Sequence, residues 1–467
     1  MTGAPHSAAF AWGPILCLVA LAAALTALTA VGPALHLAYG GWALMLIFAA
    51  GGAGIWLALR IADRANQHGA LIVILVGALL MRLGLLFAEP YLSTDIYRYI
   101  WDGRVQAAGI NPYRYLPIAP ELSHLRDAAI FPNINRPDYA VTIYPPAAQA
   151  VFLAITGILG ESVVAMKLGL IAFEALTVAA LIGVLRHLGR PLTRVAVYAW
   201  HPLPVWEIAG SGHVDAAMCA LLIAGFLLFL RGRTLLAGAV VTLGALIKPT
   251  ALLALPVLWR PWNWRLPLMV ALTVVLAYLP YLAVGGGALG YLGGYIKEEG
   301  FDTGRGFALL WLMESYTGYL PAAVYVYATV AAAIIVGLAI AVGFRKDRSE
   351  GTAVACLSWL LTVFLVLATP HFPWYFLALV PMLALNPLAT GWVLTLGAPL
   401  LYDSAIGTGW LASDVRLALF TFAPVAALAF DAWRLRRTSL NLTVGETHEP
   451  SRERQGQQPG HRPASVS

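Results

Sequence analysis

The sequence has little charge for its length. Of its 467 residues, 11% are Asp, Glu, Lys or Arg, whereas 60% are hydrophobic. Soluble domains carry about 25% charged residues, so the chain lacks the charge that a water-exposed surface needs. This excludes an ordinary soluble enzyme and a disordered protein. The alternating strands of a β-barrel are also disfavoured, and the composition predicts an all-α, polytopic transmembrane protein.

Cysteine is scarce as well, and no basic surface for nucleic acid is present. The three cysteines, Cys17, Cys219 and Cys356, lie singly in apolar runs. An odd, scattered set indicates packing residues rather than a disulfide framework or a metal site. The net charge of +6 comes from short Lys and Arg clusters between apolar runs, which is typical of membrane topology. We therefore expect membrane lipids, and no nucleic acid, as partners.

Apolar runs that could form spanning helices recur along the chain and predict about 12 to 14 spans. Two segments are ambiguous. Residues 146–160 are short, and residues 234–258 are interrupted by Lys248-Pro249, which allows one kinked span or two half-helices. If 146–160 lies against the membrane and 234–258 is a hairpin, the basic clusters all face the cytoplasm, as the positive-inside rule favours.

This topology divides the chain into a transmembrane domain, 1–437, and a polar tail, 438–467, which is expected to be disordered and cytoplasmic. Polar segments 89–162, 201–215 and 285–319 then share the outer side. The first is a candidate catalytic loop, because a long polar insertion in so apolar a chain is typical of function. The third is rich in glycine and is a candidate lid.

The densest group of polar residues opens the first outer segment. A helix that begins after Ser93-Thr94 would carry four polar residues on one face, at spacing i, i+3, i+4 and i+7. These are Asp95, Arg98, Tyr99 and Asp102, and Arg104 follows. Asp95 would lie in the first turn, where the helix N-terminus favours a carboxylate, and it could accept a proton from a hydroxyl. The alternative is an ordinary interfacial helix with Asp–Arg pairs.

Other candidates lie in the later loops. Tyr144 opens a Tyr-Pro-Pro sequence that could fix the entry of a short helix or serve only as a turn. In the second outer segment, His213 and Asp215 could orient an acceptor, steady a phosphate or join Glu207 in a divalent metal site. Their spacing matches no strong ligand motif, and a simple polar turn is the alternative.

Three further basic residues are candidates for binding a substrate. Lys248 breaks an apolar run, and it could meet a phosphate from the lipid or pair with a structural acid such as Glu174. Arg305 lies in the glycine-rich segment. His371 lies at an outer helix junction beside two aromatic residues, which an aromatic belt alone would explain.

Taken in order, these motifs resemble the GT-C superfamily of integral membrane glycosyltransferases, and most closely its bacterial mannosyltransferase-like members that use polyprenyl-phosphate sugars. The motifs are Asp-x-Tyr-Arg-Tyr-x-Trp-Asp-Gly at 95–103, Asn-Pro-Tyr-x-Tyr at 111–115, Tyr-Pro-Pro at 144–146 and Lys-Pro at 248–249. The resemblance covers roughly residues 70–390. Two spans precede the catalytic loop in addition to those of the family.

The resemblance implies an inverting transfer of a hexose, expected to be mannose, from a polyprenyl-phosphate donor to a lipid or glycan acceptor. The site would face the extracytoplasmic side of a bacterial inner membrane. Asp95 corresponds to the catalytic base. The expected substrate-binding residues are Arg98, Tyr99, Asp102, Arg104, Tyr144, His213, Asp215, Lys248, Arg305 and His371.

No metal or other cofactor is expected, because the chain lacks the Asp-x-Asp motif of metal-using relatives. The alternative is a bound divalent metal ion. A glycolipid transporter or flippase and a ligase that transfers whole glycans remain as alternatives.

Overall fold

The computed structural model describes residues 12–318, 321–402 and 411–446. Within these ranges the chain forms helices and turns but no strand, which confirms the predicted all-α fold. The first half contains α1 (Trp12–Tyr39), α2 (Gly41–Ala62), α3 (Gln67–Leu86), α4 (Asp95–Ala107), η1 (Pro120–Leu125), η2 (Phe131–Asn133), α5 (Pro146–Leu159), α6 (Val163–His187), η3 (Leu192–Val195), α7 (Ala196–Ala199), α8 (Pro202–Pro204), η4 (Val205–Gly210) and α9 (Asp215–Leu230). The second half contains α10 (Thr234–Ala245), η5 (Pro249–Ala254), α11 (Leu255–Leu258), α12 (Arg265–Tyr278), η6 (Leu279–Leu289), α13 (Leu292–Glu298), α14 (Ala308–Thr317), α15 (Pro321–Gly343), α16 (Glu350–Ala368), η7 (Pro373–Phe376), α17 (Leu379–Leu385), α18 (Ala389–Leu396), η8 (Ala398–Leu401) and α19 (Ser413–Glu446).

Among the described residues, eight helices are long and apolar enough to cross a membrane: α1, α2, α3, α6, α12 continued by η6, α15, α16 and α19. Five apolar helices are shorter, including α5, α9 and α10. Eight is fewer than the predicted 12 to 14, because several apolar runs are divided into pieces shorter than the roughly 20 residues that a span needs. The protein is thus a polytopic helical membrane protein with several half-length helices.

The hairpin interpretation of 234–258 is confirmed. α10 ends at Ala245, Lys248 is extended, and Pro249 starts η5, because proline cannot continue the hydrogen bonding of the preceding helix. η5 and α11 pack back against α10. Lys248, at the turn of this hairpin, therefore lies at one end of the helical bundle.

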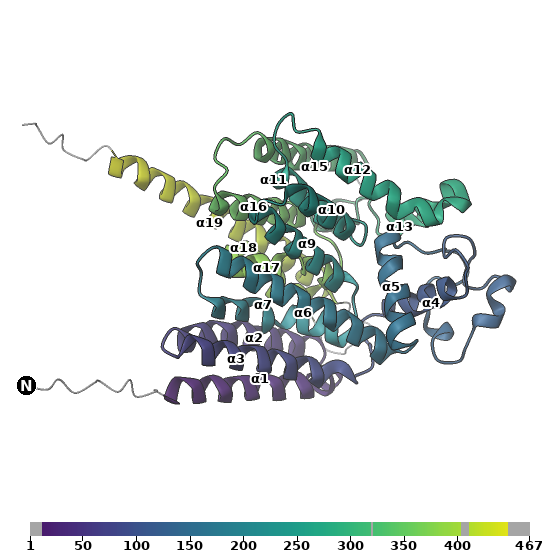
Figure 1. Cartoon of the computed structure of the whole chain (residues 1–467), viewed down its shortest axis with the longest axis horizontal. Helices are drawn as coiled ribbons and strands as arrows, with labels where there is room; N and C mark the ends of the chain where they lie inside the picture. The colour runs from purple at the N-terminus through teal and green to yellow at the C-terminus, as the bar shows by residue number, and fades with distance from the viewer. Residues whose placement is uncertain (1–11, 319–320, 403–410, 447–467) are drawn as a thin grey trace, which may run out of the picture.

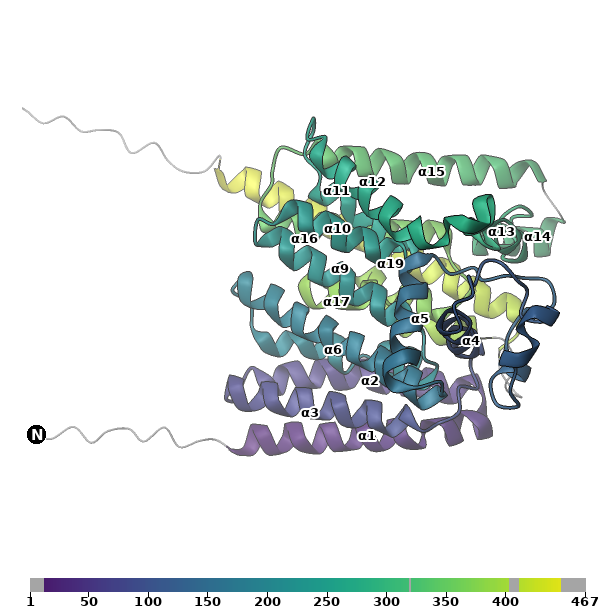
Figure 2. The same cartoon turned by 45° about the vertical axis from the view of Figure 1, so that its right-hand side comes forward.

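The long helices lie side by side with roughly parallel axes, with α1 to α3 along one edge and α12 and α15 along the opposite edge (Figures 1 and 2). We call one end the loop end: it gathers residues 89–145 and 279–317, including α4, α13 and α14, and α5 packs beside α4 (Figure 2). The predicted first outer segment and the predicted lid therefore share one end. α4 lies tightly on α5, since a Cβ added to Gly103 would lie 2.6 Å from Thr156 Oγ1.

The opposite end, which we call the basic end, comprises loops 186–194, 259–265 and 345–350. Hydrogen bonds join two of these loops to neighbouring elements at this end: His187 pairs with Glu350 at 2.7 Å, and the Arg194 guanidinium donates to the Ala384 carbonyl at 2.9 Å. The basic clusters predicted to share one side of the membrane thus lie together.

Glu174 was one possible acid for the alternative in which Lys248 forms an ion pair, but it does not pair with Lys248. Instead, Arg82 Nη2 lies 2.5 Å from Glu174 Oε1, and Arg82 Nε lies 3.1 Å from Oε2, with both side chains buried. α3 packs against α6, so this pair closes inside the helical bundle, where an unpaired charge would be costly.

Helices are present in part of the predicted tail, 438–467, and in the predicted lid, 285–319. α19 continues to Glu446, so residues 438–446 are helical rather than disordered, because the chain has no proline or glycine there before Gly445. Residues 447–467 lie outside the described residues. The predicted lid, 285–319, contains α13 and α14, and its last residue also lies outside the described part.

Candidate active site

A cavity of about 790 Å³ opens at the loop end. It is lined by residues 91–95 and 247–250, together with parts of 135–145, 292–301 and 364–375. Its volume falls within the range of about 300–1,000 Å³ that small-molecule sites occupy. Most of its surface is apolar, and the charged side chains that line it are Asp95, Arg136, Lys248 and Glu299.

Asp95 is the first residue of α4, as predicted, and its side chain lines the cavity. The N-cap residue, Thr94, makes no side-chain cap hydrogen bond, but the Asp95 backbone N–H donates to Ser93 Oγ at 3.2 Å, so the predicted serine engages the first N–H of the helix. Asn135 Nδ2 donates to Asp95 Oδ1 at 2.7 Å. The carboxylate is therefore held at a helix N-terminus, where the helix dipole favours negative charge. Asn135 contacts only one of its two oxygens, Oδ1.

Burial raises the pKa of Asp95 above the ordinary aspartate value, and this effect outweighs the opposing attraction of Lys248 and Arg136 and the hydrogen bond from Asn135. A carboxyl group with a raised pKa is a stronger proton acceptor once it is ionised. Perturbed groups of this kind, when they line a cavity, are typical of catalytic acids and bases.

Lys248 lines the same cavity, at the break between α10 and η5. Its Nζ lies 3.4 Å from Asp215 Oδ2, and only 12% of its side chain is exposed. The ammonium also lies 4.5 Å from the centre of the Tyr375 ring. Lys248 is thus a cation held by a buried acid, Asp215, and presented to the cavity.

Arg136 was missed by the sequence reasoning, although it lines the cavity. Its φ of 53° lies in the left-handed region, which non-glycine residues rarely adopt. Arg136 Nε lies 2.5 Å from Glu298 Oε2 of α13, and the guanidinium lies 5.9 Å from the centre of the Tyr295 ring. The only sequence signal was its place in a polar stretch of the first outer segment, beside Pro137.

Tyr144 lines the cavity, whereas Tyr99 lies fully buried behind it. The two rings meet edge to face at 5.0 Å, and Tyr99 stacks on Phe152 of α5 at 4.6 Å. The Tyr113 hydroxyl donates to the Tyr144 carbonyl at 2.6 Å. This aromatic packing fixes the position of Tyr144.

Arg98, Asp102 and Arg104 are committed to ion pairs and are not among the residues that line the cavity. Arg98 Nε lies 2.9 Å from Asp102 Oδ1. Arg104 pairs with Asp127 and with Glu161, each at 2.7 Å. These are the Asp–Arg pairs of the alternative interpretation, and they hold the outer segment against α4. Direct contact with substrate stays a prediction for all three.

His213 and Asp215 lie fully buried behind the cavity wall. The His213 ring stacks on Trp374, with ring centres 3.9 Å apart, and Trp374 lines the cavity. His213 Nε2 lies 3.4 Å from Glu207 Oε2, and the Tyr402 hydroxyl donates to Glu207. In the part of the chain that the structure describes, no three His, Cys, Asp or Glu side chains are grouped so as to hold a metal ion.

Arg305 and His371 lie together near the cavity. Arg305 Nη2 lies 2.8 Å from Glu314 Oε1, and a hydrogen bond of 2.8 Å joins His371 Nε2 to the Arg305 carbonyl. His371 stands between Pro370 and Phe372, which both line the cavity. Contact of either residue with a donor phosphate stays a prediction.

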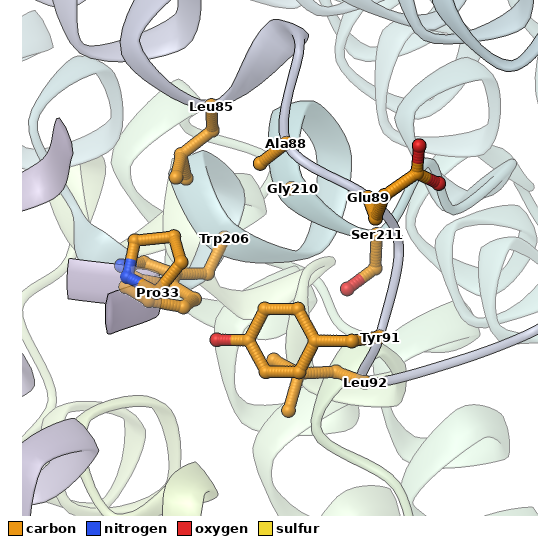
Figure 3. Close-up of a pocket in the computed structure, with 9 residues that line it drawn as sticks. All are labelled: Pro33, Leu85, Ala88, Glu89, Tyr91, Leu92, Trp206, Gly210 and Ser211. Carbon is orange, nitrogen blue, oxygen red and sulfur yellow. The ribbon is translucent and has the colours of Figure 1, made fainter. Parts of the chain in front are cut away.

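A second, much smaller cavity has a volume of about 10 Å³ (Figure 3) and shares Tyr91 and Leu92 with the lining of the first. Figure 3 shows Pro33 of α1 against Trp206 of η4, with the Tyr91 ring beside them, and Tyr91 lines both cavities. A space of this size holds one water molecule at most. A Cβ added to Gly32 would lie 2.6 Å from Trp206 Cζ2, so α1 packs closely against η4.

A comparison with known protein families matches the part of the chain that holds most of the charged residues of the cavity. Residues 6–265 match the family described as "Alpha-(1->6)-mannopyranosyltransferase, N-terminal domain". Asp95, Arg136, Asp215 and Lys248 all fall within the match, whereas the wall formed by 292–301 and 364–375 lies beyond it. No solved structure gives a significant match.

Two curated relatives, both named Alpha-(1->6)-mannopyranosyltransferase A, are similar to this chain. The protein from Mycobacterium tuberculosis (strain ATCC 25618 / H37Rv) is 30% identical over 187 residues, which cover 38% of this chain and 34% of the relative. The protein from Corynebacterium glutamicum is 27% identical over 194 residues, which cover 38% of this chain and 37% of the relative. The similarity thus spans about a third of the length of these relatives. Because the family match covers more than half of the sequence, the chain belongs to the family described as alpha-(1->6)-mannopyranosyltransferase, N-terminal domain.

Proposed function

We propose that this protein is a membrane mannosyltransferase. It moves mannose from a polyprenyl-phosphate donor to a hydroxyl of a lipid or glycan acceptor, with inversion at the anomeric carbon. The observation that carries the proposal is the joint position of one carboxylate, Asp95, and two cations, Lys248 and Arg136, in a single cavity with largely apolar walls. The family and the names of the relatives support mannose and a 1→6 linkage, which requires a primary hydroxyl on the acceptor.

In the proposed reaction the acceptor oxygen attacks the anomeric carbon as its proton passes to the Asp95 carboxylate. The new carbon–oxygen bond forms, the bond from the anomeric carbon to the phosphate oxygen breaks, and polyprenyl phosphate leaves with the electron pair. Lys248 and Arg136 stabilise the negative charge that develops on the phosphate, which is an electrostatic contribution of large effect in a water-poor site. Holding both substrates in the cavity supplies a further part of the rate.

A lipid-linked donor suits the walls of the cavity. Phe364 and Leu365 line it from α16, a helix long enough to span the membrane, and Phe372 lines it nearby. Such a wall could admit a polyprenyl chain directly from the bilayer. Because the Lys and Arg clusters gather at the opposite end, the positive-inside rule supports an extracytoplasmic cavity.

The proposal is tested with purified protein, a synthetic acceptor and radiolabelled polyprenyl-phosphate mannose. We expect labelled acceptor and free polyprenyl phosphate in equal amounts, and no transfer when a nucleotide-linked mannose replaces the lipid donor. Movement of an intact glycolipid across vesicles without cleavage would instead indicate a transporter. Transfer only of whole glycans from a lipid diphosphate would indicate a ligase.

A change of pH should report the ionisation of Asp95. The base acts only when it is ionised, and burial raises its pKa, so kcat/KM should rise with pH through a pKa above that of an ordinary aspartate. Asn135 hydrogen-bonds to Asp95 and favours the charged form, so Asn135→Ala should move this rise to higher pH by about one unit, since hydrogen bonds to charged groups contribute about 1.5–3 kcal/mol.

The measurement is the pH profile of kcat/KM for the natural protein and for Asn135→Ala. Asn133→Ala is the matched control, because Asn133 Nδ2 donates to the Ala129 carbonyl and not to Asp95. An unchanged profile in Asn135→Ala would contradict the assignment of the ionising group to Asp95.

A further inference from the structure

A second large cavity, of about 420 Å³, lies at the basic end and is separate from the candidate active site. It is a groove between α15, α16 and α19, and α16 packs against both other helices. Trp359, Leu360 and Val363 line it from α16, and Leu338 lines it from α15. Its volume is within the range of small-molecule sites, and its lining is almost entirely apolar.

Two arginines give this groove its charge. Arg345 follows the end of α15, Arg436 lies on α19, and both line the groove and are exposed. Neither forms an ion pair with any side chain that the structure describes. Arginines elsewhere, such as Arg82 and Arg98, are paired with acids. The groove therefore combines an apolar floor with two arginines that form no ion pair with the described side chains.

The carboxylates nearest to this groove are occupied by other donors. Asp347 accepts hydrogen bonds from the Ser349 backbone N–H at 2.9 Å and from the Thr352 hydroxyl. These two contacts, Thr352 first, lower the pKa of Asp347, and Arg345 adds a smaller effect. Glu350 pairs with His187. Asp347 thus stays ionised near Arg345, and the two arginines that line the groove outweigh this single carboxylate, which leaves a net positive charge for an anion to meet.

The molecule that fits this groove is a lipid of the surrounding membrane. α15 exposes large apolar side chains such as Val330, Ile334 and Ile340, so lipid is the natural neighbour of this face. Basic pockets between spanning helices on the cytoplasmic side bind the headgroups of anionic lipids. We propose that this groove binds one anionic phospholipid of the leaflet at the basic end, with an acyl chain along α16 and the phosphate between Arg345 and Arg436.

The test measures how many phosphatidylglycerol molecules the full-length protein retains, by native mass spectrometry after extraction from nanodiscs of phosphatidylglycerol and phosphatidylcholine. We expect one retained phosphatidylglycerol per chain and no specific phosphatidylcholine. Arg345→Gln together with Arg436→Gln should weaken this retention about 30-fold, since both guanidinium groups lose their direct charge-assisted contacts to the phosphate. Ala355→Trp, which keeps both arginines and fills the groove, should abolish it.

The matched control is Arg260→Gln together with Arg265→Gln, which removes the same charge from the basic end outside the groove. The control should retain phosphatidylglycerol within about threefold of the natural protein, because simple surface attraction is weak and screened by salt. Equal loss in the control, equal retention of phosphatidylcholine, or unchanged retention in Ala355→Trp would each overturn the proposal. Thermal melting checks that each variant is folded, and Arg436→Gln alone serves if the double variant is not.

Discussion

Replacing Asp95 with asparagine is expected to lower the rate of mannosyl transfer by a factor of about 10² to 10⁴, the range that general base catalysis contributes. The amide has the shape of the carboxylate and can still accept the hydrogen bond from Asn135, but it cannot take up the proton of the acceptor. The measurement is kcat with the polyprenyl-phosphate donor, made alongside donor binding, which should change little.

The stability of this variant should move in the opposite direction from its activity. The pKa of Asp95 is raised in the folded protein, so folding favours the protonated carboxyl. That contribution is present below the pKa of the unfolded chain and is lost as the pH rises through the folded pKa. At neutral pH the ionised carboxylate therefore costs stability, and Asp95→Asn should melt at the same temperature as the natural protein or above it.

Asp138→Asn is the matched control, because Asp138 lies exposed in the same outer segment and is not among the residues that line the cavity. It should retain full activity. An Asp95→Asn protein that transfers mannose at the natural rate would show that another group removes the proton, whereas loss of activity in both variants would point to the charge of the segment as a whole.

Replacing Lys248 with methionine is expected to lower the transfer rate by a factor of about 10² to 10³, comparable to the loss of one group that stabilises transition-state charge. It should also destabilise the protein, because Asp215 is 1% exposed and would lose the cation 3.4 Å away. Breaking a buried ion pair from one side typically costs about 3–5 kcal/mol. Rate and melting temperature should therefore fall together.

The double variant Lys248→Met with Asp215→Asn separates the two roles of the lysine. It removes both charges, so most of the lost melting temperature should return, whereas the transfer rate should stay low. If the double variant recovered activity along with stability, Lys248 would serve only to neutralise Asp215, and the phosphate would need another cation. Lys297→Met, a substitution of an exposed lysine on α13 that does not line the cavity, controls for the loss of a positive charge near the loop end.

The elements that sequence reasoning predicted well are those set by local chemistry. The start of α4 at Asp95 follows from a serine that engages the first N–H and a carboxylate in the first turn. The hairpin at Lys248-Pro249 follows from the missing N–H of proline. Both features depend on residues within a few positions of each other, and so one sequence is enough to find them.

The parts that could not be predicted depend on pairing between distant residues. Glu174 is one acid of the apolar runs that could pair with Lys248, but in the structure Lys248 pairs with Asp215 and Glu174 pairs with Arg82. The charges in a sequence do not determine which acidic residue pairs with which basic residue, because the pairing depends on how the helices pack.

Two residues of the site lie in the irregular part of the first outer segment and were not predicted. Asn135 and Arg136 lie in a stretch without helical or strand periodicity, where turn residues have no preferred face. Arg98, by contrast, lay on the expected face of α4, yet its pairing with Asp102 turns it away from the residues that line the cavity. Residues on one helix face are thus predicted to lie near one another, but this does not predict that each of them contacts a ligand.

The pairing of Arg82 with Glu174 has a consequence for biogenesis. The two residues are 92 positions apart in the chain, so at a synthesis rate of about 5–20 residues per second α3 leaves the ribosome several seconds before α6 exists. During that interval the newly made α3 carries, about one turn from its C-terminal end, an arginine with no acid to neutralise it, and charged residues within spanning helices are costly to insert. The ion pair can close only after α6 has been made, so the first three helices cannot reach their final state without the arrival of a later one.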